Sequence, residues 1–500
     1  MIISKVNESI LKISDIEYDE SKFLSEQFSF YADNYRFHPK HKMKKWDGKI
    51  RLYNSFNSTL PVGLFNKLTN ILNAANFDYK VKGSMGIDIP LTEHEVNNFV
   101  KNEMKCELNF RDYQTEAFID MLGKNRCVGV LPTSSGKSLL QYMVINYLLN
   151  RGYVKNCLLI VPTVNLVNQM EYDFLDYASN LINYKDKVHK IYSGEEKDTD
   201  KPITISTWQT LQNFNDEKFS EYDLVMVDEC HESTAKELSR IVTLCHNSKF
   251  KYGVSGSLED TQVHLMQLEA LFGVIKEYIT TKELTDKNIV TKATIYNLVL
   301  KYDKEEKKEY NRLIKQLKNK HKDGDIGAKG YFLENEFITT NDKRKHFILK
   351  TINKCKGNTL ILFKNVEYGR ALFELSKEKL NRNVYFIYGD VKPEEREKIR
   401  LMMEEEEDAI VFATLKIFST GINIKKLEYV VFSQNVKSKI KVIQSIGRSL
   451  RKHKDKSSSK VIDIIDDING KNYSVKHAMS KLELYDKQQF DYKIKEFNLQ

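Results

Sequence analysis

Short apolar segments alternate with longer helical segments along most of this 500-residue chain, and this alternation constrains the fold more than any other feature. The segments are mainly apolar, which is typical of strands buried on both faces of a parallel sheet. The helical segments between them have the length that the crossovers of a parallel sheet require. One series of apolar segments spans 126–132, 157–162, 203–207, 223–229 and 252–257. A second spans 358–364, 383–389, 409–414, 428–434 and 460–466.

The two series predict two α/β domains, each built on a parallel sheet. The first 95 residues lack the alternation and predict a separate, small α+β domain. We therefore expect three domains, at 1–95, 96–283 and 284–500, which is consistent with the chain length. The charged segment 301–327 predicts an exposed helix followed by a glycine-containing loop.

Composition excludes several classes of protein. No apolar run approaches the ~18 residues that cross a bilayer, and the first residues do not have the pattern of a signal peptide. The six cysteines are far apart and form no pairing motif, which predicts free thiols in a reducing cytoplasm. The formal net charge of +9 favours a polyanionic partner.

A candidate phosphate-binding loop, LPTSSGKS, spans 131–138. It follows a predicted strand and opens a predicted helix, so backbone N–H groups and the helix N-terminus would face an anion. In this motif the Lys137 side chain reaches the β and γ phosphates, and the Ser138 hydroxyl binds Mg²⁺. The motif departs from the general pattern at Leu131, where glycine is usual. The nucleotide-binding residues that we predict here are Thr133, Ser134, Ser135, Gly136, Lys137 and Ser138.

The segment Asp228-Glu229-Cys230-His231 ends another apolar strand. A strand that runs into a polar loop would explain it, and so would a metal site, although four consecutive residues do not converge easily on one tetrahedral ion. An ATPase offers a third explanation, which the phosphate-binding loop favours. Asp228 would then hold hydrated Mg²⁺, and Glu229 would orient and deprotonate the attacking water.

The segment 444–451 carries Gln444, Arg448 and Arg451 on a predicted helix. Arginines three residues apart lie on one helical face. A surface helix with two arginines is common, but in a protein with a phosphate-binding loop they are candidate arginine fingers for the γ-phosphate.

Together these segments resemble, in order, the motifs of superfamily 2 helicases and translocases. The matching segments are 111–118, 133–138, 161–169, 228–231, 255–257, 361–369, 413–423 and 444–451. The resemblance implies two RecA-like motor domains, ATP and Mg²⁺ as cofactors, and an adenine contact from Gln114. It also implies that His231, Ser255, Ser257 and Gly421 couple the nucleotide state to motion, and that Thr163, Asn165 and Thr414 contact the nucleic-acid strand. Asn423 departs from the acid that many relatives carry at that position.

Segments 35–54 and 60–64 resemble the amino-terminal domain of the UvsW family, the recombination and repair helicases of T-even-like phages. This resemblance implies a helicase acting on branched DNA and DNA–RNA hybrids, including forks, Holliday junctions and R-loops. It places the protein in the cytoplasm of an infected bacterium, with no membrane partner. We expect a monomer, with phage single-strand-binding or recombination proteins as candidate partners.

A basic cluster lies between residues 36 and 51. This segment contains seven lysine and arginine residues and a single acid, Asp47. Lysine and arginine side chains neutralise backbone phosphates, so the cluster predicts a DNA-binding surface. The alternative is a solvated face over an ordinary core, and we expect the interleaved aromatic side chains to be buried there. The seven cations are Arg36, Lys40, Lys42, Lys44, Lys45, Lys49 and Arg51.

Three classes of function remain open on the sequence. The first is an ATP-dependent helicase, the second is a DNA-stimulated translocase that does not separate strands, and the third is a nucleic-acid-binding protein without catalysis. The first two share all the motor motifs, so strand displacement must be measured beside ATP turnover. The third would require Lys137, Asp228, Glu229 and Arg451 to coincide by chance.

Overall fold

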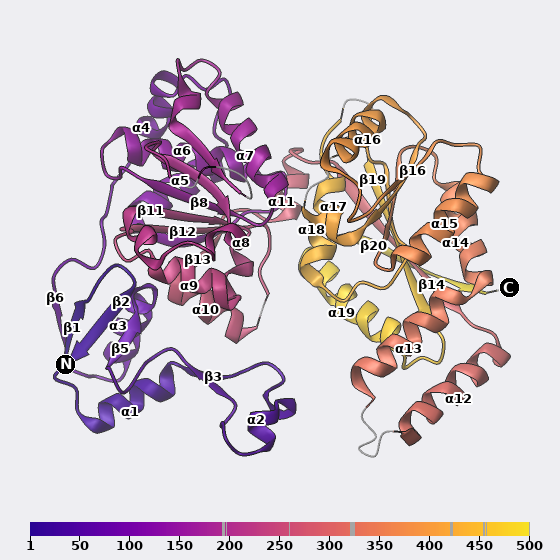
Figure 1. Ribbon diagram of the computed structural model, residues 1–500, viewed down its shortest axis with the longest axis horizontal. Coiled ribbons are helices and arrows are strands. Elements are labelled where there is room, and N and C mark those ends of the chain that lie inside the picture. Colours follow the sequence, from indigo (N-terminus) through magenta and orange to yellow (C-terminus); the bar gives the residue numbers. More distant parts are fainter. Residues whose placement is uncertain are drawn as a thin grey trace. The chain divides into compact units, whose positions relative to one another are not determined.

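The computed structural model describes residues 1–192, 196, 198–259, 261–320, 326–420, 424–453, 456 and 458–499, with 393, 419 and 420 described by their backbone alone. The chain divides into two compact units. The first comprises residues 1–132 and 136–279, and the second comprises residues 280–500 with loop residues 133–135. Each unit is considered by itself (Figure 1).

The amino-terminal domain belongs to the first unit and is a small α+β fold, as the sequence predicts. Its main sheet has the order β5-β2-β1-β6, with antiparallel pairs except for β1 and β6, and strands β3 and β4 form a second, antiparallel pair. Its strands are β1 (Ile2–Lys5), β2 (Ile10–Ser14), β3 (Ser29–Tyr31), β4 (Lys49–Arg51), β5 (Thr59–Pro61) and β6 (Lys80–Lys82). Its helices are α1 (Tyr18–Gln27), α2 (Pro39–Lys42) and α3 (Phe65–Ala74).

The rest of the first unit is an α/β domain around a seven-stranded parallel sheet of order β13-β7-β12-β11-β8-β10-β9. The central strands are buried along their whole length, because helices cover both faces of the sheet (Figure 1). The strands are β7 (Arg126–Val130), β8 (Cys157–Val161), β9 (Val188–Ile191), β10 (Ile203–Thr207), β11 (Leu224–Asp228), β12 (Phe250–Ser255) and β13 (Val274–Glu277). The helices are α4 (Glu93–Asn98), α5 (Asp112–Lys124), α6 (Lys137–Asn150), α7 (Val164–Tyr177), α8 (Trp208–Leu211), α9 (Lys236–Leu244) and α10 (Gln262–Phe272).

The second unit repeats this architecture with a seven-stranded parallel sheet of order β16-β17-β15-β18-β19-β14-β20. The strands are β14 (Lys292–Lys301), β15 (Thr359–Phe363), β16 (Val384–Ile387), β17 (Ile410–Thr414), β18 (Tyr429–Phe432), β19 (Ser458–Asp467) and β20 (Asp491–Asn498). The helices are α11 (Thr281–Asp286), α12 (Lys304–Lys320), α13 (Gly327–Thr340), α14 (Asp342–Lys354), α15 (Val366–Lys379), α16 (Pro393–Glu405), α17 (Leu415–Thr420), α18 (Lys439–Ser449) and α19 (Tyr473–Lys487).

All ten predicted apolar segments are strands of these two sheets, so the predicted pair of α/β domains is confirmed. Four strands of these sheets are not predicted from the sequence: β9, β13, β14 and β20. Strands β9, β13 and β20 lie at sheet edges, and β20 is exposed along most of its length. The predicted exposed helix is α12, in which Tyr310 is the buried residue.

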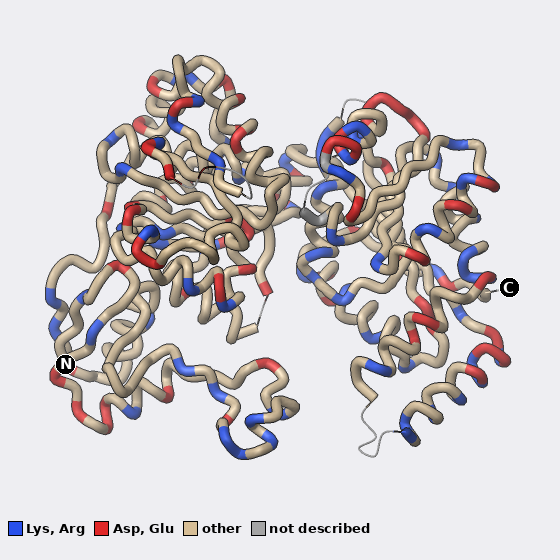
Figure 2. Tube along the Cα trace, viewed as in Figure 1, with Lys and Arg blue, Asp and Glu red and all other residues tan. Residues whose placement is uncertain are grey.

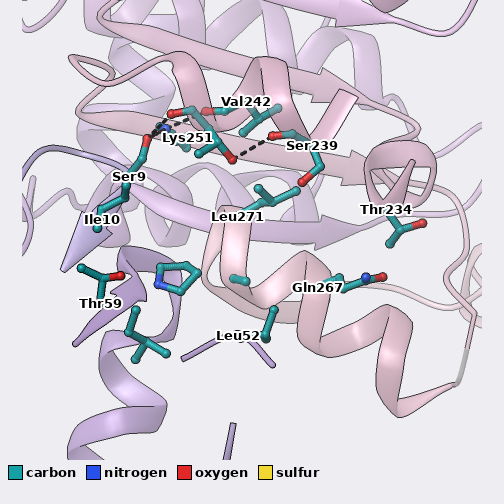
Figure 3. A pocket seen from close by; sticks show the side chains of 14 residues that line it. Ser9, Ile10, Leu52, Thr59, Thr234, Ser239, Val242, Lys251, Gln267 and Leu271 are labelled. Carbon is teal, nitrogen blue, oxygen red and sulfur yellow. Dashed lines mark hydrogen bonds between the residues drawn. The ribbon is translucent and has the colours of Figure 1, made fainter. Parts of the chain in front are cut away.

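Buried polar contacts join the amino-terminal domain to the first α/β domain. The Lys251 ammonium on β12 donates to the Ser9 hydroxyl at 2.7 Å and to the Val242 carbonyl at 2.8 Å (Figure 3). The buried Arg126 guanidinium forms an ion pair with Glu8 at 3.1 Å. A cavity of about 310 Å³ lies along this junction. Helix α10 also contributes Met266 and Ala270 to the hydrophobic core of the amino-terminal domain. The two domains therefore share one core.

Candidate nucleotide site and nucleic-acid surfaces

The predicted phosphate-binding loop connects β7 to α6 at the carboxyl edge of the first sheet, the edge where open parallel sheets bind ligands. Gly136 lies immediately before α6 with φ +86°, in the left-handed region that favours glycine. The Lys137 ammonium donates to the carbonyl oxygens of Leu131 at 3.1 Å and Pro132 at 3.5 Å. The ammonium is thus held against the backbone of the loop. The predicted residues Thr133, Ser134 and Ser135 complete this loop.

Gln114, the predicted adenine contact, is bound to the same loop. Its side-chain amide donates to the Gly136 carbonyl at 3.2 Å and accepts from the backbone N–H of Arg111 at 3.0 Å. A Cβ atom at position 136 would lie 2.5 Å from the Gln114 amide nitrogen, so this contact also requires glycine. The structure thus brings Gln114 to the edge of the phosphate-binding loop.

Asp228 ends β11 and Glu229 follows it in the left-handed conformation, with φ +50°. A glutamate in this region is strained, and such strain persists where the surrounding structure imposes it, often at functional sites. Burial, and then the neighbouring Glu229, raise the pKa of Asp228. Burial opposes the ionisation of Glu229, but the hydrogen bond with His231 and the charge of Lys137 lower its pKa overall. The pKa values of the two acids are therefore shifted in opposite directions. The charge of Lys137 acts to lower the pKa of both.

Two residues that the sequence does not predict complete this site. The Gln141 amide donates to Asp228 Oδ1 at 3.2 Å, and the Tyr177 hydroxyl lies 2.8 Å from Ser138 Oγ. Gln141 follows Ser138 by three residues on α6, so both lie on one helical face. That spacing was the available signal for Gln141, whereas Tyr177 comes from the end of α7 and has no local signal.

The predicted coupling residues of the first unit form one network. His231 Nδ1 lies 3.0 Å from Ser255 Oγ, and the Ser255 hydroxyl also lies 3.3 Å from Glu229 Oε2. The backbone N–H of Ser257 donates to Ser255 Oγ at 3.4 Å. Gly421, the fourth predicted coupling residue, and Asn423 lie outside the described residues.

Cys230 is buried and packs against Gly253 of β12, where a Cβ atom would lie 2.9 Å from the Cys230 sulfur. Burial raises the pKa of this thiol well above its usual range. Among the described residues, no three His, Cys, Asp or Glu side chains are placed to share a metal ion. Cys230 therefore acts as a small apolar side chain that packs on β12.

The second unit holds Gln444 and Arg448 on α18, four residues apart and on one face. The prediction that Arg451 lies on the same helix as Gln444 and Arg448 is wrong, because α18 runs from Lys439 to Ser449. The physical reason lies at Leu450. Its carbonyl accepts hydrogen bonds from the N–H and hydroxyl of Thr291, at 2.7 and 2.8 Å, so the chain leaves the helix there.

The predicted strand contacts lie at helix starts and strand ends. Thr163 caps α7 by accepting a hydrogen bond from the Leu166 N–H at 3.4 Å, and Asn165 lies in the first turn. Thr414 is the last residue of β17. Each lies at the carboxyl edge of its own sheet.

The basic cluster 36–51 spans the segment from the end of β3 through α2 to β4, and Lys49 and Arg51 lie on β4 (Figure 2). Six of its cations are exposed, and Lys49 is half-buried. Arg51 forms an ion pair with Asp47, which leaves the charges of the α2 region to dominate this surface.

The expectation that the aromatic side chains of this cluster are buried is wrong for Phe37, which is 64% exposed. The Trp46 side chain is half-buried and donates to the Lys49 carbonyl at 2.8 Å, whereas Tyr53 is buried in the domain core. Phe37 lies in a short 3-10 helix between β3 and α2, where no apolar layer covers it.

Family models match three parts of the chain. "DNA helicase UvsW, N-terminal" matches residues 9–83, "Type III restriction enzyme, res subunit" matches 107–260, and "Helicase conserved C-terminal domain" matches 343–453. This chain is 35% identical to the ATP-dependent DNA helicase uvsW of Enterobacteria phage T4. The alignment covers 97% of this chain and 97% of that protein. The chain belongs to the UvsW family of superfamily 2 helicases.

Solved structures agree with membership of the UvsW family. The crystal structure of T4 UvsW aligns with 31% identity and a TM-score of 0.51, covering 100% of this chain and 99% of that one. The structure of S. cerevisiae Dbp5 bound to RNA and ADP BeF3 aligns with 14% identity and a TM-score of 0.52, covering 82% of this chain and 94% of that one, which shows the fold alone.

The predicted fold class, two RecA-like motor domains after a small α+β domain, is thereby confirmed. As a UvsW-family member, the protein is an ATP-dependent superfamily 2 helicase that acts on nucleic acid. None of the helices in the described part of the chain combines the length and apolar character needed to cross a bilayer.

Proposed function

We propose that this helicase remodels branched DNA and DNA–RNA hybrids, including forks, Holliday junctions and R-loops, during phage recombination, repair and replication. One observation carries the proposal: the domain with the exposed basic cluster shares a core with the domain that holds the phosphate-binding loop. Such an arrangement lets a motor grip duplex DNA beside the strand that it translocates on. The proposed site of action is the cytoplasm of the infected bacterium.

In the proposed nucleotide site, residues 133–138 cradle the phosphates of ATP and Gln114 contacts the adenine. Backbone N–H groups at the start of α6 and the Lys137 ammonium stabilise the negative charge that spreads over the transferred phosphoryl group. Glu229 positions the attacking water and accepts its proton. Its lowered pKa keeps the carboxylate ionised, so that it can accept a hydrogen bond from the water and orient it.

The donor set of Ser138 and Asp228 fits Mg²⁺, which prefers oxygen ligands and usually retains several waters. The Gln141 amide donates to Asp228 Oδ1 at 3.2 Å, which helps to orient this carboxylate. When bound, Mg²⁺ would neutralise phosphate charge. The burial of Asp228 supports this assignment, because a buried acid favours a nearby cation.

In the second motor domain we propose Gln444, Arg448 and Arg451 as the groups that act on the γ-phosphate. Arg448 lies over the Phe418 ring, with 5.9 Å from its guanidinium carbon to the ring centroid, which restricts the orientation of its side chain. We propose functional domains at 1–95, 96–283 and 284–500, and a monomer that works with phage single-strand-binding or recombination proteins.

The test compares ATP turnover and strand displacement by the full-length chain on single strands, duplex, forks, four-way junctions and R-loops. We expect branched substrates to give both the strongest stimulation of ATP turnover and strand exchange at the branch. ATP turnover without displacement on any substrate would establish the alternative, a translocase that does not separate strands. Equal activity on duplex and branched DNA would contradict the proposed preference.

A further inference from the structure

Each of the two proposed Mg²⁺ ligands in the first motor domain contacts a polar side chain that is not itself a proposed ligand. The Tyr177 hydroxyl lies 2.8 Å from Ser138 Oγ, and the Gln141 amide nitrogen lies 3.2 Å from Asp228 Oδ1. Tyr177 is the last residue of α7, whereas Gln141 lies on α6, three residues after Ser138. Side chains in such positions orient metal ligands and tune the affinity of a metal site.

The contact with Tyr177 bears on how Ser138 can bind a cation. A serine hydroxyl has one proton and two lone pairs, and its proton rotates to suit the nearest partner. When the Ser138 hydroxyl donates to Tyr177, its proton is directed to the tyrosine and a lone pair of Oγ is left for Mg²⁺. Without Tyr177, the metal would have to fix this hydroxyl itself.

Packed aromatic rings hold Tyr177 in place. Its ring centre lies 5.5 Å from that of Tyr142, which is fully buried on α6. The Tyr142 ring also packs edge-on against Phe174 of α7, with ring centres 5.2 Å apart, and lies 5.5 Å from the ring centre of Tyr184. The Tyr184 hydroxyl in turn accepts from the Asn146 side-chain amide at 2.8 Å. Tyr177 therefore has the support that a side chain needs in order to orient another group.

Gln141 is fully buried, and one of its side-chain atoms lacks a partner. Its amide nitrogen donates to Asp228, but no group among the described residues donates to its Oε1 atom. A buried acceptor without a donor is unfavourable, so such an atom needs an explanation. Mg²⁺ retains several waters when it binds to a protein, and waters donate hydrogen bonds. The Oε1 atom of Gln141 therefore fits the hydration of a cation held by Asp228.

We propose that Tyr177 and Gln141 form the outer shell of the Mg²⁺ site. Tyr177 accepts the proton of the Ser138 hydroxyl, whereas Gln141 orients Asp228 through its amide nitrogen and accepts from the hydration of the cation through Oε1. Both are positioning residues, because each acts through a metal ligand or through water. This inference rests on the proposed function, since it takes Ser138 and Asp228 as the ligands.

The test measures how Mg²⁺ promotes the binding of a fluorescent, non-hydrolysable ATP analogue to the full-length chain, so that metal affinity is read without turnover. Tyr177→Phe keeps the ring that packs on Tyr142 and removes only the hydroxyl. Gln141→Met keeps most of the buried volume and removes both polar atoms. Each change should raise the Mg²⁺ concentration at half-maximal binding by about 10-fold, and the two together by about 10²-fold, because they act on different ligands.

Tyr184→Phe is the matched control. It removes a buried hydroxyl from the same group of rings, but this hydroxyl contacts Asn146. Its melting temperature should fall, because the Asn146 amide loses an acceptor, while its Mg²⁺ midpoint should equal that of the wild type. A midpoint raised equally in Tyr184→Phe and Tyr177→Phe would assign the effect to ring packing and overturn the role of Tyr177.

Excess Mg²⁺ gives a second readout that a merely structural role would not move. ATP turnover by Tyr177→Phe should recover as Mg²⁺ approaches saturation, because added metal compensates for a weaker site. Unchanged Mg²⁺ midpoints in both Tyr177→Phe and Gln141→Met would overturn the proposal.

Asp228→Asn separates this failure from a failure of the proposed function. If Asp228→Asn raises the midpoint while Tyr177→Phe and Gln141→Met match the wild type, only the outer shell is wrong. If Asp228→Asn also leaves the midpoint unchanged, the proposed metal site itself is wrong.

Discussion

The hydroxyl of Ser255 bridges two elements of the first motor domain. It lies 3.0 Å from the Nδ1 atom of His231 and 3.3 Å from a carboxylate oxygen of Glu229. Ser255 ends β12, whereas Glu229 and His231 follow the neighbouring strand β11. A single hydroxyl thus connects the proposed water-activating acid to the loop after β12, which is the relationship that a coupling residue requires.

Ser255→Ala should therefore separate hydrolysis from mechanical work. The variant loses the hydrogen bonds of this hydroxyl, each of about 1 kcal/mol, but retains Lys137, Asp228 and Glu229, so ATP turnover should stay close to that of the wild type. Strand displacement should fall strongly. Measuring both activities on one forked substrate checks this, with Ser239→Ala as a control in which the hydroxyl is removed from α9. If both activities fell in parallel, Ser255 would instead support catalysis.

Glu229→Gln should leave ATP binding intact and reduce turnover by about 10²-fold or more, because only the proton acceptor is lost. Asp228→Asn should instead raise the Mg²⁺ concentration that hydrolysis requires, since the proposed metal ligand loses its charge. ATP binding and single-turnover hydrolysis, measured across a Mg²⁺ titration, distinguish the two variants. Equal Mg²⁺ dependence in both would mean that the roles of these adjacent acids are not divided as proposed.

Arg451→Ala should reduce turnover by about 10³-fold while ATP affinity changes little, because an arginine finger acts mainly on the transition state. Lys452→Ala, one residue further along, removes a neighbouring cation and is the matched control. Nucleotide binding is followed with a fluorescent ATP analogue beside steady-state hydrolysis. Loss of binding at an unchanged maximal rate would assign Arg451 to ground-state binding.

The sequence predicts the parts of this protein that local patterns determine. Buried strands such as β8 and β11 have continuous apolar runs, and the phosphate-binding loop has a spacing that its chemistry imposes. Tyr177 could not be predicted as a partner of Ser138, because the contact depends on how α7 packs on α6. The end of α18 could not be predicted for a similar reason. Thr291, which is far away in the sequence, donates a hydrogen bond to the Leu450 carbonyl.

Lys251 predicts a pH dependence of stability. Burial, and then Arg126, lower its pKa to about 7, although Cys245 and Glu8 act in the opposite direction. Between about pH 7 and the unfolded value of about 10.4, the unfolded chain binds a proton that the folded chain does not, so this residue makes stability rise with pH. The slope is up to about 1.4 kcal/mol per pH unit. Lys251→Met should flatten this part of the profile.

Thermal unfolding of the full chain at several pH values tests this prediction. Lys249→Met is the matched control, because Lys249 is an exposed lysine two residues earlier in the chain. A profile that kept its slope in Lys251→Met would show that the folded protein holds this lysine protonated.

The last prediction concerns the basic cluster 36–51. Removing Lys42, Lys44 and Lys45 together, each as Lys→Ala, should make the salt dependence of duplex binding shallower by about 2.7, at about 0.9 for each phosphate contact. Remodelling of a labelled four-way junction should then fail at moderate salt before it fails at low salt. ATP turnover without DNA should not change, because these side chains are exposed on the amino-terminal domain, away from the phosphate-binding loop.

The matched control removes Lys22, Lys80 and Lys82, which are exposed in the same domain but outside the cluster. Both variants lose three positive charges, so a general effect of net charge would act on them equally. If only the Lys42, Lys44 and Lys45 variant loses slope, the phosphate contacts belong to the α2 region. If the two variants behave alike, the cluster is a solvated face and the motor domains alone bind the DNA.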